Sequence, residues 1–190
     1  DSVTCDDTTT TDTTNAGATP ASDRHYPVDT SAGDFTGTVI ADAVVDGYGL
    51  AFTNTVGGAN TLSVINDGTV QIDAGLTATQ GGSAALAINA IGATDVDYSG
   101  TGDVLNLGAT GNGLDIRTTG TGNIVANVGG DVTSALSGIG VYANNSGTSG
   151  DVTITTAADT LISGGLMGVF ATSTNVTSDG AVSVTNNADV

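Results

Sequence analysis

The same pattern of apolar positions occurs twice in succession, in residues 84–107 (AALAINAIGATDVDYSGTGDVLNL) and in residues 112–132 (NGLDIRTTGTGNIVANVGGDV). Each segment begins with an apolar-x-apolar triplet, has a second apolar position about ten residues later, and has a third before the next turn. The pattern recurs about every 28 residues. Its three columns are Leu86, Leu114, Val141 and Val169; Val96, Ile124, Val152 and Val182; and Val104, Val132 and Leu161.

Three short strands per repeat predict an all-β fold, a parallel β-helix (β-solenoid) with three strands in each coil of about 28 residues. When the same residue classes recur in the same order, like positions lie above one another in a stack of coils. An antiparallel sandwich or barrel is the rival fold, because short strands and turns every roughly 8 to 12 residues are typical of it too. The long repeat favours the solenoid.

The strands can be grouped in threes, with alternate residues facing the interior. In the first coil the predicted inward pairs are Leu50 and Phe52, Leu62 and Val64, and Val70 and Ile72; in the second they are Leu86 and Ile88, Val96 and Tyr98, and Leu105 and Leu107. Glycine-rich segments such as 100–102 and 120–122 permit the positive φ of sharp corners between strands.

The chain divides at the first dense apolar positions. Residues 1–34 are a Thr/Asp-rich N-terminal leader with little to bury, which we expect to be loosely ordered or to cap the first coil. Residues 35–190 are expected to form the β-helix segment, with about five coils and an incomplete last one. The last residues align with the middle of a coil, so we expect either a fragment or a subunit whose open end is paired by another chain.

The chain is strongly acidic. Its 190 residues include 20 acidic side chains, all Asp, and two basic ones, Arg24 and Arg117, which gives a net charge of −18. The absence of Glu and Lys, with abundant Asp, Gly and Thr, disfavours helices. This charge repels phosphate backbones and anionic lipid, and no apolar run is long enough for a spanning helix. We therefore expect neither nucleic-acid binding nor membrane insertion.

The single cysteine, Cys5, excludes an internal disulfide and metal sites made of several thiolates. A lone tail thiol is the simpler interpretation of Cys5, and an intermolecular bridge is the alternative. The sequence begins at Asp1 without a Met or a signal peptide, as a processed chain does, so export is the expectation.

Residues 35–190 resemble the passenger domains of bacterial autotransporters, of the repetitive β-helix type. The resemblance lies in the Gly-Leu/Val-x-apolar rungs, the Thr/Asn/Asp-rich turns and the absence of Lys, Glu and Trp. The start Asp1-Ser2-Val3-Thr4-Cys5 is similar to the mature start of some members. The resemblance implies a right-handed parallel β-helix that a C-terminal barrel carries across the outer membrane for display outside the cell. Passengers include adhesins, self-associating factors, proteases and esterases, so the resemblance is specific for architecture and not for function.

Candidate catalytic groups are few. The single histidine, His25, lies in the leader, and a Ser/His/Asp triad would need it. Asp95 and Asp97 alternate on one predicted strand and Arg117 lies one coil later, a set that a carbohydrate-active β-helix with paired carboxylates would use. Because Asp is so frequent here, such pairs arise from composition alone. We expect no catalytic residues and no enzymatic activity, unless these three side chains share a cleft.

Acidic residues fall just ahead of the third strand in successive repeats, at Asp67, Asp103, Asp131, Asp159 and Asp189. In-register stacking would place their carboxylates about 5 Å apart, where like charges repel. We expect each to accept hydrogen bonds from the amides of its own turn and to face water. Weak Ca²⁺ binding by Asp67, Asp103, Asp131 and Asp159 is the alternative, since hard cations bind oxygen ligands. No other cofactor is expected.

The sequence thus predicts a structural segment of a secreted or surface-displayed bacterial protein that serves as a stalk, an adhesin or a self-association surface. The expected partners are a cell-surface or matrix molecule, or further copies of the chain, including an end-to-end homo-oligomer. The alternatives are a carbohydrate-active β-helix enzyme and a subunit of an extracellular filament completed by its neighbour.

Overall fold

A computed structural model describes residues 1–6, 27–78, 82–174 and 180–189. Eighteen strands are formed in this part of the chain, and no helix. These strands pair in parallel and form three sheets. The predicted fold class is confirmed: the chain is a β-solenoid of about 5 turns with roughly 28 residues per coil.

Each coil contributes at most one strand to each sheet. The seven-stranded sheet contains β1 (Ser2–Cys5), β3 (Phe35–Val39), β6 (Thr61–Asn66), β9 (Asp95–Gly100), β12 (Ile124–Val128), β15 (Val152–Thr156) and β18 (Val182–Thr185). The six-stranded sheet contains β2 (Val28–Asp29), β5 (Leu50–Asn54), β8 (Ala84–Ala90), β11 (Asn112–Thr118), β14 (Ile139–Asn145) and β17 (Met167–Ser173). The five-stranded sheet contains β4 (Val44–Val45), β7 (Thr69–Ile72), β10 (Asp103–Asn106), β13 (Val132–Thr133) and β16 (Ile162–Ser163).

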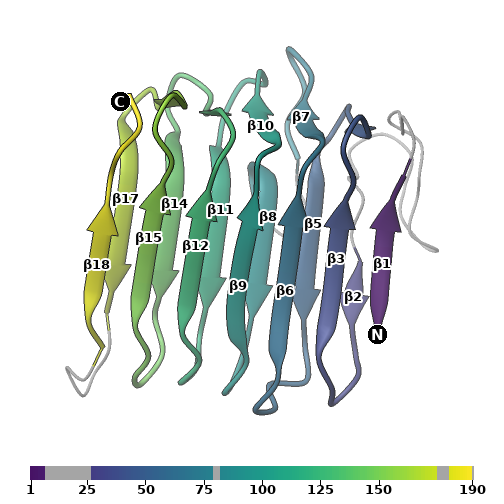
Figure 1. The fold of residues 1–190 in the computed structure, drawn as a ribbon, viewed down its shortest axis with the longest axis vertical. Helices are drawn as coiled ribbons and strands as arrows, with labels where there is room; N and C mark the ends of the chain where they lie inside the picture. Colours follow the sequence, from purple (N-terminus) through teal and green to yellow (C-terminus); the bar gives the residue numbers. More distant parts are fainter. Residues whose placement is uncertain (7–26, 79–81, 175–179, 190) are drawn as a thin grey trace.

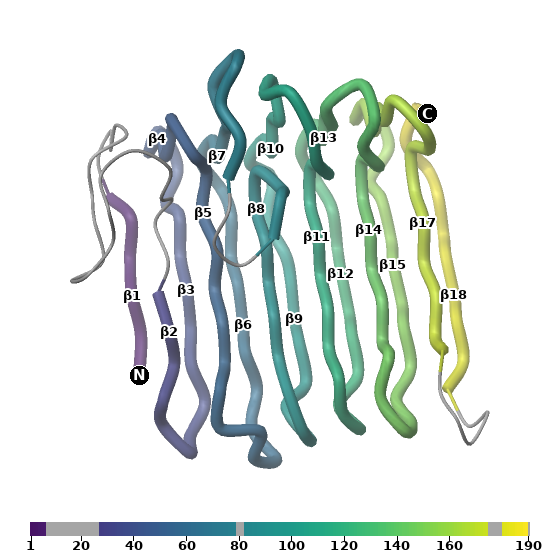
Figure 2. Tube along the Cα trace, turned by 180° about the vertical axis from the view of Figure 1, so that it is seen from behind, coloured from purple at the N-terminus to yellow at the C-terminus, as the bar shows by residue number. Residues whose placement is uncertain are grey.

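The three sheets make a flattened stack of coils. In Figure 1 the seven-stranded sheet lies in front of the six-stranded sheet, and the short strands of the five-stranded sheet close one edge between them. Figure 2 shows the same stack from behind, with the coils following one another in sequence order along it. Every coil therefore contacts the coil before it and the coil after it, and side chains far apart in sequence form rows that run across the strands.

The core follows two of the three predicted columns. Leu86, Leu114 and Val141 pair in one row of the six-stranded sheet, and Val96, Ile124 and Val152 pair in one row of the seven-stranded sheet. All six of these side chains are buried. The inward pairs predicted for the first coil are buried as well.

The prediction of the third column was wrong at Leu161. Val132 pairs with Ile162 rather than Leu161, and the exposed fraction is 0% for Ile162 and 48% for Leu161. The turn before β16 is longer than its counterpart before β13 and contains Asp159 at a φ of 62°. Because side chains alternate along a strand, an error of one residue moves the chosen side chain from the core to the surface.

The pair Leu105 and Leu107 was also wrong, since Val104 and Asn106 face the core instead. The side-chain nitrogen of Asn106 donates to the backbone carbonyls of Thr110 and Asn112, and its side-chain oxygen accepts from the backbone amide of Gly108. A buried amide whose bonds are satisfied by the following turn is stable in the interior. Counting apolar residues alone cannot find such a position.

Paired strands begin before residue 35. Ser2 pairs with Thr36, which places β1 at the edge of the seven-stranded sheet, and Asp29 pairs with Asn54, which places β2 beside β5. The leader thus contributes a strand near each of its ends, while residues 7–26 between them lie outside the described residues.

Candidate functional site

The three residues of the enzymatic alternative do not share a cleft. Asp95 and Asp97 lie on β9 of the seven-stranded sheet, whereas Arg117 lies on β11 of the six-stranded sheet, the opposite layer of the stack in Figure 1. Asp95 accepts hydrogen bonds from the backbone amide of Asn123 at 2.7 Å and from its side chain at 3.2 Å. The arrangement does not place two carboxylates and a cation around one substrate.

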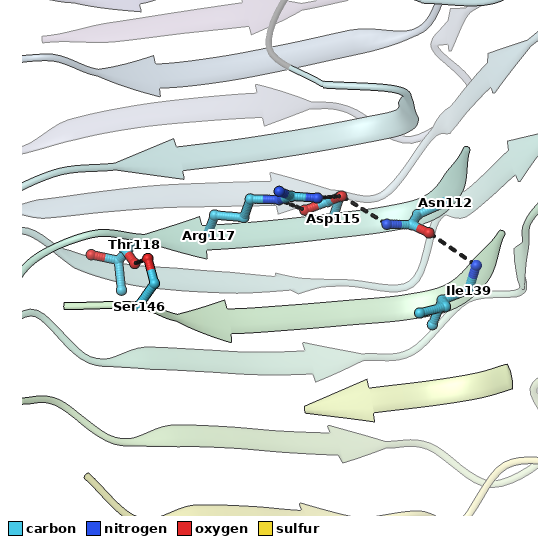
Figure 3. A network of polar contacts seen from close by, with 6 residues as sticks. All are labelled: Asn112, Asp115, Arg117, Thr118, Ile139 and Ser146. Carbon is cyan, nitrogen blue, oxygen red and sulfur yellow. Dashed lines mark hydrogen bonds and ion pairs between the residues drawn. The ribbon is translucent and has the colours of Figure 1, made fainter. Parts of the chain in front are cut away.

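Arg117 is instead paired within its own strand. Its Nε and an Nη donate to the two carboxylate oxygens of Asp115 at 2.6 and 2.8 Å, and the Asp115 side chain is only 4% exposed. Asn112 donates to Asp115 at 2.7 Å and accepts from the amide of Ile139 at 2.9 Å, as Figure 3 shows. This chain of contacts joins β11 to β14 of the next coil. Just after β14, the amide and the hydroxyl of Ser146 both donate to the Thr118 carbonyl, and Figure 3 shows the contact of the hydroxyl.

Two aromatic rings extend this cluster along the outer face. The Arg117 guanidinium lies 4.9 Å from the centroid of the Tyr142 ring, and the Tyr142 and Phe170 rings are stacked 5.5 Å apart with an interplanar angle of 7°. The hydrogen bond to Asp115 raises the pKa of Arg117, so the guanidinium remains charged. This Asp–Arg–Tyr–Phe cluster holds three consecutive coils together.

Sequence reasoning missed the cluster, although the repeat contains the signal for it. Asp115, Tyr142 and Phe170 each follow the first apolar residue of the triplet, and they pair in one row. Aligning the outward positions as carefully as the inward ones would have brought them together.

The five acids at the corner do not form one column. Asp103 pairs with Thr69 rather than with Asp67, and the row of Asp103 and Asp131 continues through Leu161 before it reaches Asp189. The prediction of a continuous acidic column is therefore wrong, for the same reason that misplaced Leu161: turn lengths vary between coils.

Three of these carboxylates accept hydrogen bonds from the following coil and not from their own turn. Asp67 accepts from the amide of Thr101 at 3.1 Å, Asp103 from the amide of Asp131 at 3.0 Å, and Asp131 from the amide of Leu161 at 2.8 Å. The same contact recurs at the other corner, where the acceptor and amide pairs are Asp34 and Thr61, Asp95 and Asn123, Asn123 and Asp151, and Asp151 and Ala181. We call these contacts the coil-to-coil ladder.

An acidic groove of about 400 Å³ lies along the five-stranded sheet. It is lined by Asp42, Asp67 and Asp103 together with Thr69 and Thr101, whereas Asp131 and Asp159 are not part of it. Within the described ranges, no three His, Cys, Asp or Glu side chains are placed to hold a metal ion. Of the four Ca²⁺ candidates, Asp67 and Asp103 line the groove and also belong to the ladder, Asp131 belongs to the ladder alone, and Asp159 belongs to neither.

The remaining candidates lie at the N-terminal end. His25 is outside the described residues. Cys5 is a free thiol on β1, and burial, followed by the charge of Asp6, raises its pKa. A raised pKa keeps the thiol protonated near neutral pH, which makes it a poor nucleophile.

The ladder predicts that replacing two acids in the same coil, Asp103 and Asp97, has unequal costs in stability. Replacing Asp103 with Ala leaves the amide of Asp131 without its acceptor and should lower the free energy of unfolding by about 1 kcal/mol. Asp97 is exposed, and Asp97→Ala should change that free energy by less than about 0.5 kcal/mol. Urea denaturation of the two variants measures the difference, and equal costs would contradict a stabilising role for the ladder.

Comparison of the chain with protein family models, with curated proteins and with solved structures finds no match in any of the three. In the part of the chain that the structure describes, no helix is long and apolar enough to cross a membrane.

Proposed function

We propose that this chain is a structural segment of a secreted or surface-displayed bacterial protein, of the kind found in autotransporter passengers. It serves as a stalk and offers one side of the stack for adhesion or self-association. The ladder supports a structural role, since its carboxylates bond to the next coil instead of converging around a substrate. The division of Asp95, Asp97 and Arg117 between two sheets gives no support to the enzymatic alternative.

The observation that carries the adhesive role is a set of three exposed leucines in successive turns, called here the leucine row. Leu107, Leu136 and Leu166 occupy the turns between the five-stranded and six-stranded sheets in three successive coils, with exposed fractions of 50, 93 and 68%. The backbone joins the later two turns, because the amide of Leu166 donates to the carbonyl of Gly138. Large apolar side chains that recur along one edge of so acidic a protein are typical of an interaction surface.

Surface display is tested on intact cells that produce the protein. Antibodies raised against the folded chain should label unpermeabilised cells, and external protease should remove the labelling. Labelling that appears only after permeabilisation would contradict the proposal. A periplasmic enzyme and a cytoplasmic enzyme serve as controls for cell integrity.

The leucine row gives a second test. Replacing Leu107, Leu136 and Leu166 with Ser should weaken self-association, or adhesion of displaying cells, at least about tenfold, because the apolar surface available for burial is lost. The matched control replaces Ile40, Val56 and Ile91, which are exposed by 39, 41 and 40% in other turns, with Ser. Sedimentation velocity and cell-binding assays compare the two triple variants, and equal effects would contradict a role for the row.

A further inference from the structure

A buried carboxylate fastens the shortest strand of the six-stranded sheet. Asp29, on the two-residue strand β2, has an exposed fraction of 3%. One of its carboxylate oxygens accepts from the amide and the hydroxyl of Ser31 at 2.8 and 2.7 Å, and the other accepts from the side-chain nitrogen of Asn54 at 2.7 Å. The bond to Asn54 connects β2 directly to β5.

This charge stands in an otherwise neutral row. The corresponding inward positions of later coils are Ala90, Thr118 and Asn145, which carry no charge and belong to longer strands. Few backbone hydrogen bonds join β2 to β5. The amide of Thr53 donates to the carbonyl of Pro27, and the amide of Thr55 donates to the carbonyl of Asp29. The carboxylate adds a side-chain bond to β5, through Asn54, to these backbone contacts and to the bond that the Thr55 hydroxyl donates to the Asp29 carbonyl.

The contacts of Asp29 continue into the next coil. Asn54 accepts from the amide of Gly57 and from the hydroxyl of Thr94, which also donates to Asn60, and Asn60 donates to the carbonyl of Gly33. The turn after β2 is therefore held at both of its ends by one buried network. Every member of the network except Asp29 is neutral.

We propose that Asp29 is an acid-released latch: its ionised carboxylate holds β2 and the following turn on β5, and its protonation frees them while the later coils remain stacked. The ionised group accepts from all three donors. Protonation places a hydrogen on one carboxylate oxygen. On the oxygen that faces Asn54 this hydrogen meets an NH₂ donor, and on the oxygen that faces Ser31 the hydroxyl can accept it only by giving up the bond that it donates.

The sign of the pH dependence follows from the carboxylate's surroundings. Burial opposes ionisation, but the hydrogen bonds from Ser31 and Asn54 outweigh it, so the pKa of Asp29 lies below its ordinary value of 3.8. The ammonium of Asp1 acts in the same direction. β3, β5 and the turn at 55–60 carry no titratable side chain, and Asp34 bonds instead to the amide of Thr61. The latch is at full strength above the unfolded-state pKa and is lost as the pH falls through the folded-state pKa.

Two variants separate the carboxylate from the fold. In Asp29→Asn, a side-chain NH₂ group replaces the oxygen that accepts from Asn54, so two donors face each other. Asn54 cannot turn its oxygen toward this group without losing Gly57 and Thr94. In the double variant Asp29→Asn with Asn54→Asp, the pair is reversed and every donor again meets an acceptor.

Amide hydrogen exchange of the whole chain, corrected for intrinsic rates, measures the protection of the Thr53 and Thr55 amides, which donate to β2 and to the residue before it. The amide of Ser146 is the reference for the inner coils. Between about pH 6 and pH 2.5, protection of Thr53 and Thr55 should fall at least about tenfold in the native chain, while that of Ser146 persists. Asp29→Asn should show the low protection already at pH 6, and the double variant should restore both the protection and its loss in acid.

Three results would overturn the latch. Protection of Thr53 and Thr55 that persists in acid would show that the carboxylate does not control β2. Native-like protection in Asp29→Asn would show that its charge is dispensable. Parallel loss at Ser146 would show that acid unfolds the whole stack rather than its first strand.

Discussion

Removing residues 98–125 is expected to leave a folded solenoid that is one coil shorter. The deletion joins Asp97 to Ala126, and Asp97 pairs with Val125, so the hybrid strand keeps Val96, Ala126 and Val128 on the inward side. Because stability in such a stack is approximately a sum over coils and their interfaces, the free energy of unfolding should fall by roughly a fifth. Circular dichroism, sedimentation and urea denaturation measure fold, size and stability.

Removing residues 98–124 is the matched control, since it retains only one residue more. Asp97 is then followed by Val125, and the second half of the strand turns Asn127 inward and Val128 outward. Burying Asn127 without partners and exposing Val128 should cost several kcal/mol, about 3 or more. Equal stability of the two deletion variants would mean that the row register does not determine the fold.

The second large effect is expected at a glycine corner. Gly92, Gly120 and Gly147 lie at corresponding turns of successive coils, and a Cβ on Gly120 would overlap the carbonyl oxygen of Gly92. The carbonyl oxygen of Gly92 cannot move away easily, because it accepts a hydrogen bond from the amide of Thr121 at 2.6 Å. Gly120→Ala should therefore separate two coils and lower the free energy of unfolding by about 3 kcal/mol.

Gly33→Ala is the control for this substitution. A Cβ on Gly33 meets nothing within 4 Å, and its φ lies outside the left-handed region. Its effect should stay within about 0.5 kcal/mol of zero in the same urea titration. A comparable loss at both glycines would show that the close approach of the turns is not what requires Gly120.

The sequence contained enough information for the rows that are apolar and regularly spaced. The columns through Leu114 and Ile124 were predicted correctly because their period stays close to the coil length. The prediction failed at Leu161, where the turn is longer, and at Asn106, where a polar side chain is buried by bonding to the next turn. Turn length and amide satisfaction depend on three-dimensional contacts that a count of apolar residues does not include.

The candidate sites were harder to predict than the fold. Asp103 and Asp131 were found as neighbours, but their acceptor role toward the following coil depends on which amide lies opposite each carboxylate. Arg117 was grouped with Asp95 and Asp97, whereas its partner in the structure, Asp115, lies two residues before it in the same strand. The sequence identified these charged residues by their type and their recurrence. Their contacts became clear only from the register in which the strands of neighbouring coils pair.

The coil-to-coil ladder gives the stack a chemical polarity. In each contact the acceptor belongs to the earlier coil and the amide to the later one, as between Asp95 and Asn123 or between Asp131 and Leu161. A coil that has already formed thus presents the side-chain oxygen acceptors of the ladder to its successor, whereas growth in the opposite direction would meet the backbone donors of the ladder without these side-chain acceptors. Folding that starts at the N-terminal side can add each coil to a finished template, in the order in which a ribosome releases the chain.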